Sequence, residues 1–222
     1  MSIAQNLLHI KSQLPNHVTL VAVSKTKPVA DLMEAYNAGQ RIFGENKIQE
    51  MTEKWEQMPK DIQWHMIGHV QTNKVKFMAE YVSLIHGVDS LKLLQEINKQ
   101  ALKHHRAIDC LLQIYIADEE TKFGLDEKEL NELLSSEEFQ QLKNIRIVGL
   151  MGMATFTDNQ NQIKKEFQHL KEIFDKINSL SIINYPLSII SMGMSGDYKL
   201  AIECGSTMVR IGSSIFGNKN YN

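Results

Sequence analysis

A lysine follows a short apolar run that is predicted to form a strand. The run Thr19 to Ser24 is rich in apolar and β-branched residues, and Lys25 comes directly after it. At a strand end in a barrel mouth, desolvation lowers the pKa of an ammonium group and frees the amine to attack an aldehyde. The position predicts a Schiff-base lysine, although spacing alone also allows a solvated charge or a phosphate contact. Lys27 is predicted to lie in an exposed loop, because Pro28 is expected to be the first residue of the next helix.

Two glycine-containing turns near the end of the sequence predict a phosphate site. The segment SMGMSGD, Ser191 to Asp197, offers glycines for close backbone approach and the Ser195 hydroxyl as a donor. The segment RIGSS offers Gly212 and Ser213 at the expected start of the final helix. Either turn alone could be an ordinary loop. Phosphates commonly bind at the loops after strands seven and eight of (β/α) barrels, so the two turns together favour a phosphate ligand.

Arg210 lies within the last predicted strand, two residues before Gly212 and on the same face. A guanidinium inside a barrel needs an acceptor, because burying an unpaired charge costs free energy. A carboxylate partner and a ligand acceptor are both compatible with the sequence.

Three histidines, His65, His69 and His86, lie at or just past the ends of predicted strands. For His65 and His86, a hydrogen-bonded place in a pocket is favoured over a catalytic base. The histidines show no metal-ligand spacing. Asp197 opens the helix predicted after the SMGMS turn, where aspartate is a natural N-terminal cap, and we interpret it as structural.

Short apolar runs alternate with segments of helical periodicity from Val18 onward. Most runs are apolar on both faces, as expected of a parallel sheet covered by helices. Eight such runs favour a closed (β/α)8 TIM barrel over an open doubly wound sheet, which more often has about five or six strands. The predicted strands are Thr19 to Ser24, Arg41 to Gly44, Gln63 to Gly68, Val82 to Gly87, Ile108 to Ile116, Ile145 to Met151, Leu187 to Met192 and Thr207 to Gly212.

Helical periodicity predicts an extra N-terminal helix from Ile3 to Leu14 and crossover helices at Val29 to Gly39 and Ser90 to His105. No repeat, low-complexity tract or linker marks a second domain. We therefore expect residues 1–222 to form a single α/β barrel domain.

The composition argues against several classes of protein. Of 222 residues, 43% are hydrophobic, and 24 basic and 26 acidic residues give a net charge of −2, so no basic field attracts nucleic acid. No apolar stretch approaches the ~18 residues of a membrane span, and there is no cleavable leader pattern, which predicts a cytoplasmic protein without membrane contacts. Cys110 and Cys204 lie in apolar stretches and are predicted to be buried thiols in a reducing compartment.

Five segments taken together resemble one known family. They are VAVSKTKP, FGENKIQE, WHMIGHVQTNK, MGMATF and SMGMSGDYKLAIECGSTMVRIGSSIFG, which span Val21 to Gly217. The chain resembles the pyridoxal-phosphate homeostasis proteins, which are small alanine-racemase-like proteins of fold type III. The resemblance implies a (β/α)8 barrel with pyridoxal 5′-phosphate (PLP) bound covalently to Lys25.

The resemblance also implies roles for the other predicted site residues. The phosphate would be bound by Ser195, Gly212 and Ser213, with Ser191, Met192 and Met194 nearby; Arg210 would face the pyridine nitrogen; Asn46 and His65 would lie beside the ring and its 3-hydroxyl group; Met151 and Met153 would line the pocket.

The implied function is reversible binding of PLP on Lys25, as a carrier or buffer in PLP homeostasis and not primarily as an enzyme. A monomeric state and transient delivery to PLP-dependent apo-enzymes are expected. A fold-type III racemase is the first alternative; it is disfavoured because racemases of this fold also use a C-terminal β-domain, and little sequence follows RIGSSIFG. A barrel enzyme that uses Lys25 for a substrate Schiff base without a cofactor is the second, and it gives Arg210 no role.

Overall fold

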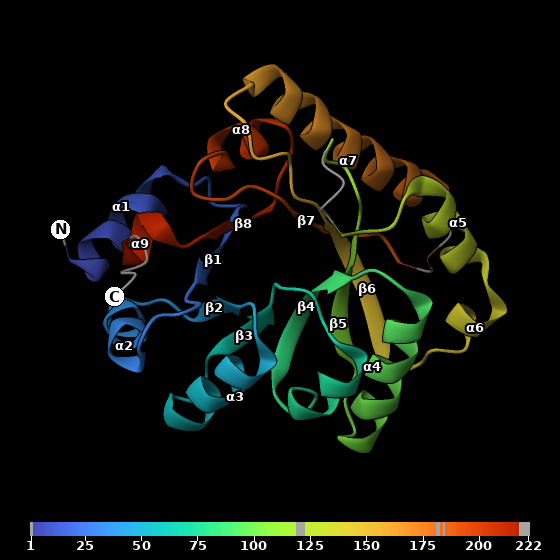
Figure 1. Ribbon diagram of the computed structural model, residues 1–222, viewed down its shortest axis with the longest axis horizontal. Helices are drawn as coiled ribbons and strands as arrows, with labels where there is room; N and C mark the ends of the chain where they lie inside the picture. Colours follow the sequence, from blue (N-terminus) through green and yellow to red (C-terminus); the bar gives the residue numbers. More distant parts are fainter. Residues whose placement is uncertain (1, 119–122, 181–182, 184, 218–222) are drawn as a thin grey trace.

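Eight parallel strands close into a barrel in which neighbours in the sequence pair with each other and β8 pairs with β1 (Figure 1). This computed structural model describes residues 2–118, 123–180, 183 and 185–217. The closed barrel confirms the predicted (β/α)8 fold. Its strands are β1 (Thr19–Val23), β2 (Ile42–Glu45), β3 (Gln63–Met66), β4 (Val82–Val88), β5 (Ile108–Gln113), β6 (Ile145–Met151), β7 (Ile189–Ser191) and β8 (Met208–Ile211).

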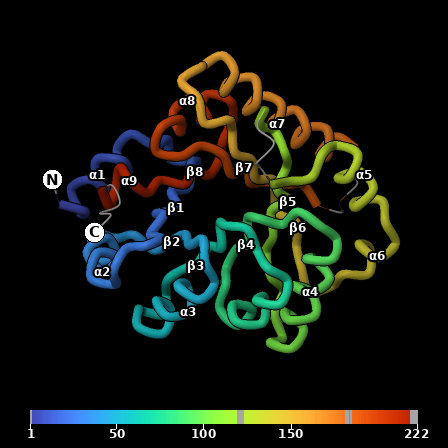
Figure 2. Tube along the Cα trace, viewed as in Figure 1, coloured from blue at the N-terminus to red at the C-terminus, as the bar shows by residue number. Residues whose placement is uncertain are grey.

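Helices surround the strands and connect them (Figure 2). The predicted crossover helices are present as α2 and α4. The helices of the described residues are α1 (Ile3–Gln13), α2 (Val29–Asn37), α3 (Ile48–Gln57), the 3-10 helix η1 (Thr72–Phe77), α4 (Leu91–Lys103), α5 (Glu127–Ser135), α6 (Glu137–Gln140), α7 (Gln160–Leu180), α8 (Tyr198–Glu203) and α9 (Ser213–Phe216).

The extra N-terminal helix is confirmed as α1, and a capping box begins it. The Ser2 hydroxyl accepts from the Gln5 N–H, and the Gln5 side chain accepts from the Ser2 N–H. The Asn6 amide donates to the Ile215 carbonyl at 3.0 Å, and α1 lies beside α9 in Figure 1. The first helix therefore holds the helix that follows the last strand.

Apolar side chains fill the barrel on both sides of its wall. The larger core lies between strands and helices and includes Cys110 and Cys204, which are buried free thiols as predicted. A smaller cluster fills the barrel interior with one side chain from each of five strands, namely Val21, Leu84, Leu111, Met151 and Met208. Since the interior is packed, a ligand can bind only beyond the strand ends.

Several element boundaries differ from the predictions. The strand predicted from Ile108 to Ile116 ends at Gln113, because Ile114 makes only an isolated bridge to Leu125. β3 and β7 are also shorter than predicted, although the flanking Ile67, Ser188 and Met192 still donate backbone hydrogen bonds to the neighbouring strands.

The prediction that Lys27 lies in an exposed loop is wrong. Its side chain is half-buried, and Nζ donates to the Phe216 carbonyl at 2.9 Å, because α9 packs over this loop. Pro28 is the cap residue before α2 and not its first helical residue.

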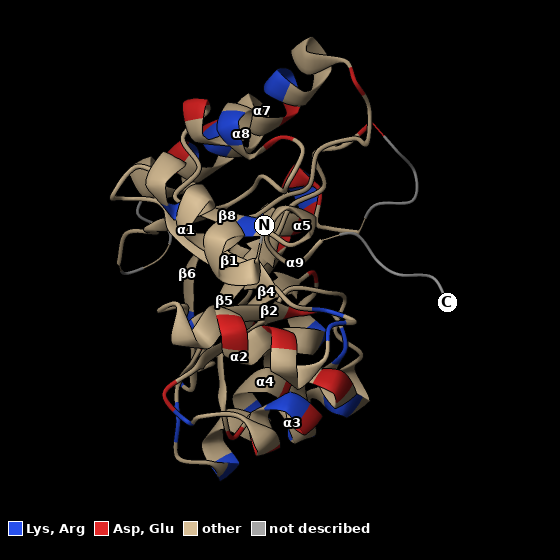
Figure 3. Ribbon diagram, turned by 90° about the vertical axis from the view of Figure 1, so that its left-hand side faces the viewer, with Lys and Arg blue, Asp and Glu red and all other residues tan. Residues whose placement is uncertain are grey.

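Charged residues of both signs are interspersed on the outer helices (Figure 3). This surface agrees with the near-neutral net charge of −2. Among the described residues, no helix combines the length and apolar character needed to span a membrane.

Candidate functional site

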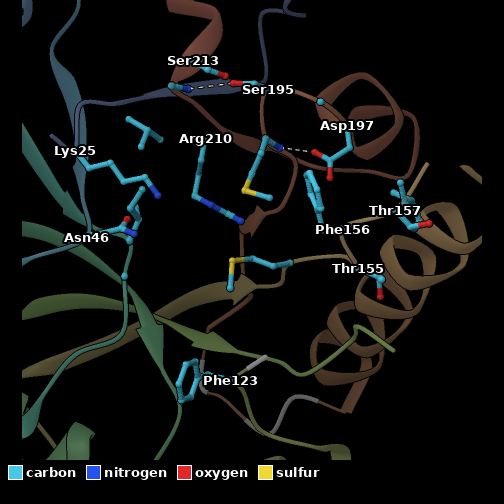
Figure 4. A pocket seen from close by; sticks show the side chains of 18 of the residues that line it. Lys25, Asn46, Phe123, Thr155, Phe156, Thr157, Ser195, Asp197, Arg210 and Ser213 are labelled. Carbon is cyan, nitrogen blue, oxygen red and sulfur yellow. Dashed lines mark hydrogen bonds between the residues drawn. The ribbon is translucent and has the colours of Figure 1, made fainter. Parts of the chain in front are cut away.

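A cavity of about 930 Å³ opens where the strands end and the connecting loops begin. In (β/α)8 barrels the functional residues lie at this carboxyl end, which makes the cavity the candidate site. Figure 4 shows the labelled Lys25, Asn46, Arg210, Ser195 and Ser213 gathered at one end of it. The predicted site residues that line it are Lys25, Asn46, Met153, Met194, Ser195, Arg210, Gly212 and Ser213.

The end of β1 directs Lys25 into the cavity. The Ser24 N–H donates to the Gly44 carbonyl at 3.0 Å, which extends the contact of β1 with β2 beyond Val23. Lys25 follows at once and is half-buried, and its side chain reaches toward Asn46 (Figure 4). Its amine therefore lies where the strand-end position predicts.

The two glycine-containing turns meet beside Lys25. The Ser195 hydroxyl accepts from the Gly212 N–H at 3.3 Å, which joins the turn after β7 to the end of β8. A Cβ on residue 212 would lie 3.1 Å from the Val23 carbonyl oxygen, so glycine lets this turn pack on the end of β1. Ser213 begins α9, and the first N–H groups of a helix have no acceptor within the helix. The turns therefore offer a hydroxyl and backbone donors together.

The turn after β7 is closed by its own residues. The Met194 N–H donates to Asp197 Oδ1 at 2.5 Å. Gly193 has φ +96°, and a Cβ there would lie 2.6 Å from the Ala201 Cβ. The structural interpretation of Asp197 therefore holds, but the carboxylate closes the turn and makes no cap hydrogen bond to α8.

Arg210 is buried at the base of the cavity, with 4% of its surface exposed. Nη1 donates to the carbonyl and hydroxyl oxygens of Ser191 at 2.8 and 2.7 Å, and Nη2 donates to the Gly152 carbonyl at 3.2 Å. Within the described chain, these hydrogen-bond acceptors are all neutral. Burial lowers the pKa of Arg210 to about 10, against the opposing charge of Asp197, so the guanidinium remains charged at neutral pH.

Two buried histidines continue the hydrogen bonding below Arg210. His86 Nδ1 lies 3.0 Å from the Ser191 hydroxyl, and His86 Nε2 lies 3.0 Å from His65 Nδ1. Burial lowers the pKa of His65 to about 3 and the pKa of His86 well below its usual range. Both rings are therefore neutral at physiological pH, as structural members of the site.

Known proteins are similar to this chain over nearly its whole length. Residues 1–220 match the family model for the alanine racemase N-terminal domain. The pyridoxal phosphate homeostasis protein of Aquifex aeolicus is 39% identical over 207 residues, which cover 93% of this chain and 89% of that protein. The one from Schizosaccharomyces pombe is 42% identical over 207 residues, or 91% of this chain and 85% of the relative. This chain belongs to the pyridoxal phosphate homeostasis protein family.

Solved structures agree with this membership. PipY of Synechococcus elongatus is 34% identical and has been solved without PLP (TM-score 0.91) and with PLP bound (TM-score 0.89); each match covers 97% of this chain and 100% of PipY. An alanine racemase of Clostridium difficile is 16% identical with a TM-score of 0.81, and this chain covers 60% of it. That likeness shows a common fold alone.

Three residues predicted for the homeostasis-family site lie beneath the cavity lining. His65, Met151 and Ser191 are buried and do not line the cavity, so the prediction that Met151 lines the pocket is wrong, whereas the place of His65 beside a cofactor ring stays a prediction. The Met151 side chain belongs to the interior apolar cluster, and Ser191 turns its hydroxyl toward Arg210. Met192 packs in the core between barrel and helices.

Other lining residues were not predicted for the site. His69 stacks on Phe123 with 4.8 Å between ring centroids, and its Nδ1 lies 3.5 Å from an Asp89 carboxylate oxygen. Two quoted segments signalled part of this wall: MGMATF contains Thr155 and Phe156, and WHMIGHVQTNK contains Ile67 to His69. Phe123 had no such signal, since it is distant in sequence from every motif. The unpredicted lining residues include Ile67, Gly68, His69, Gln113, Phe123, Thr155, Phe156, Thr157, Asp158, Gln160 and Ile163.

Proposed function

We propose that this protein binds PLP covalently through Lys25 and acts as a reversible carrier of the cofactor in PLP homeostasis. The observation that carries the proposal is the meeting of an amine, a hydrogen-bonding pair of turns and a guanidinium in one cavity. PipY, which has been solved with PLP bound, supports it as a relative of 34% identity.

The chemistry of the donor groups fits PLP. An amine suits its aldehyde, hydroxyl and backbone donors suit its phosphate, and a guanidinium suits its pyridine nitrogen. When bound, PLP supplies a reactive aldehyde on an electron-withdrawing ring. We propose the following roles: Lys25 Nζ forms the imine bond, Ser195, Gly212 and Ser213 bind the phosphate with Met194 beside it, Arg210 faces the ring nitrogen, and Asn46 lies at the ring.

The position of Arg210 favours a PLP carrier over a PLP-dependent enzyme. A guanidinium is a permanent donor, and a donor directed at a pyridine nitrogen disfavours protonation of that nitrogen. The ring then withdraws electrons weakly, which disfavours carbanion chemistry such as that of transaminases; racemases of this fold work with the same weak sink but also need a second base on the opposite face of the substrate. We therefore propose that the protein is not primarily an enzyme, that it works in the cytoplasm, and that it passes PLP transiently to apo-enzymes.

The attachment is tested by reduction with borohydride. The purified protein with PLP should show a visible absorption band, and reduction should fix the cofactor on the peptide that contains Lys25. Lys25→Ala should abolish both, while Lys27→Ala serves as the neighbouring control. An adduct confined to Lys27 or Lys74 would overturn the assignment.

A second experiment distinguishes a PLP carrier from an amino-acid racemase. The loaded protein should reactivate an apo-transaminase and leave the optical purity of single-enantiomer alanine and serine unchanged. Turnover above roughly 1 per second would instead identify a fold-type III racemase, since enzymes typically work at or above that rate.

A further inference from the structure

A buried cluster of charged side chains lies beneath the turn that carries Lys25. Lys54 of α3 donates from Nζ to Glu45 at 2.7 Å, to Glu50 at 2.7 Å and to the Ser24 carbonyl at 2.8 Å. The Ser24 hydroxyl donates to the same Glu45 oxygen at 2.6 Å. We call the three charged residues Glu45, Glu50 and Lys54 the Lys54 cluster. It contacts the residue before Lys25 through both backbone and side chain.

The cluster also contacts the residue after Lys25. The Thr26 N–H donates to Glu50 Oε1 at 2.5 Å. Thr26 has φ +62°, a left-handed conformation that is strained for a β-branched residue. Its side chain is exposed, so packing does not hold it in this conformation. Glu50 therefore supplies the contact that favours the strained turn.

Stability alone does not account for this cluster. The Glu45 side chain is fully buried and that of Lys54 is 6% exposed, and burying such ions is commonly less favourable than burying apolar residues of similar size. Within the described residues, Glu45 Oε2 has no hydrogen-bond partner. Backbone strain together with buried charge at one turn is typical of a functional site, where the turn holds a side chain in a required position.

We propose that Glu50 and Lys54 are positioning residues for Lys25. By holding Thr26 in its left-handed conformation, they keep the Lys25 amine directed into the cavity whether or not it holds cofactor. This inference rests on the proposed function, because a reversible carrier needs its amine to return to one place after each release. It predicts that the Lys54 cluster affects bond formation to the aldehyde and leaves phosphate binding nearly unchanged.

Two ligands separate these effects. PLP reports bond formation through its visible band, and pyridoxine 5′-phosphate, which has an alcohol in place of the aldehyde, reports ring and phosphate binding alone. Glu50→Ala should weaken PLP binding on the order of tenfold, since loss of the contact releases the strain at Thr26, and should change pyridoxine 5′-phosphate affinity less than about twofold. Glu53→Ala, an exposed residue of the same helix, is the matched control.

Rescue distinguishes positioning from a merely structural role. Glycine adopts a left-handed conformation without strain, so Thr26→Gly added to Glu50→Ala should restore most of the PLP affinity. An equal loss for both ligands, or no rescue by Thr26→Gly, would overturn the proposal. If Glu50→Ala folds poorly, Glu50→Gln replaces it. Its PLP affinity is then compared with and without the added Thr26→Gly substitution, and equal affinities would also overturn the proposal. Absence of a visible band in the unmodified protein would refute the proposed function itself.

Discussion

Arg210 can only donate hydrogen bonds, so the Ser191 hydroxyl accepts from it. We infer that the Ser191 hydroxyl donates its own proton to His86 Nδ1, which lies 3.0 Å away. His86 then carries its proton on Nε2 and donates to Nδ1 of His65. Each member of the chain thus both accepts and donates. A proton added to the His65 or His86 ring would disrupt these hydrogen bonds and place a second positive charge close to the Arg210 guanidinium.

Stability should therefore fall on acidification. Burial lowers the pKa of His65 from 6.5 to about 3, so between these values the unfolded chain binds more protons than the folded one. Lowering the pH through this window favours unfolding by up to about 1.4 kcal/mol per pH unit per histidine. Urea unfolding at successive pH values measures the slope. His65→Gln should reduce it, and identical slopes for the two proteins would contradict the prediction.

Ser195→Ala should weaken retention of PLP. The hydroxyl accepts from Gly212 and retains its proton for an anion, and a hydrogen bond to a charged group contributes roughly 1.5–3 kcal/mol. Equilibrium dialysis against PLP measures the loss. Thr157→Ala, at another part of the same cavity, should change affinity little. Equal affinities for the Ser195→Ala variant and the unmodified protein would remove Ser195 from the phosphate site.

Among the elements, the strands were predictable and the contacts inside the barrel were not. A parallel sheet covered on both faces needs apolar residues at consecutive positions, and this signal appeared for most of the eight strands. The pairing of β3 with β4, however, shifts register between Trp64 and His65. Alternation counted along the sequence therefore cannot place His65, and its contact with His86 follows only from the closed barrel.

The turn after β7 offers a matched pair of glycines. Gly193→Ala forces a side chain into a left-handed conformation and against Ala201 and Tyr198, at a cost of about 2–4 kcal/mol. At Gly196 an added Cβ meets no atom within 4 Å, so Gly196→Ala should change stability by less than about 1 kcal/mol. Thermal unfolding compares the two variants. Similar losses at both positions would show that the turn is not held as described.

At the scale of the molecule, the two ends of the described chain meet at the site. The first strand pairs with the last, and the Asn6 side chain of α1 holds α9 through Ile215. The same region contains Lys27, which donates to Phe216. Residues from both ends thus support the turns proposed to bind phosphate.

The protein should be a monomer in solution. In the described part of the chain, the exposed large apolar side chains are distributed over different elements, including Leu8 on α1, Phe77 on η1 and Leu102 on α4. We expect these few side chains to form no contiguous patch of the size that a stable dimer buries. Sedimentation equilibrium should give the mass of one chain, and a dimer at micromolar concentration would contradict this.

The order of the strands has a consequence during translation. Lys25 emerges from the ribosome early, whereas Arg210 and Gly212 emerge with β8, the strand that closes the barrel. A nascent chain that lacks β8 has the reactive amine but neither the guanidinium nor the completed pair of turns. Under the proposed function, selective loading of the cofactor must therefore await the synthesis of β8, so a ribosome stalled before β8 should expose a lysine that reacts with aldehydes without discrimination.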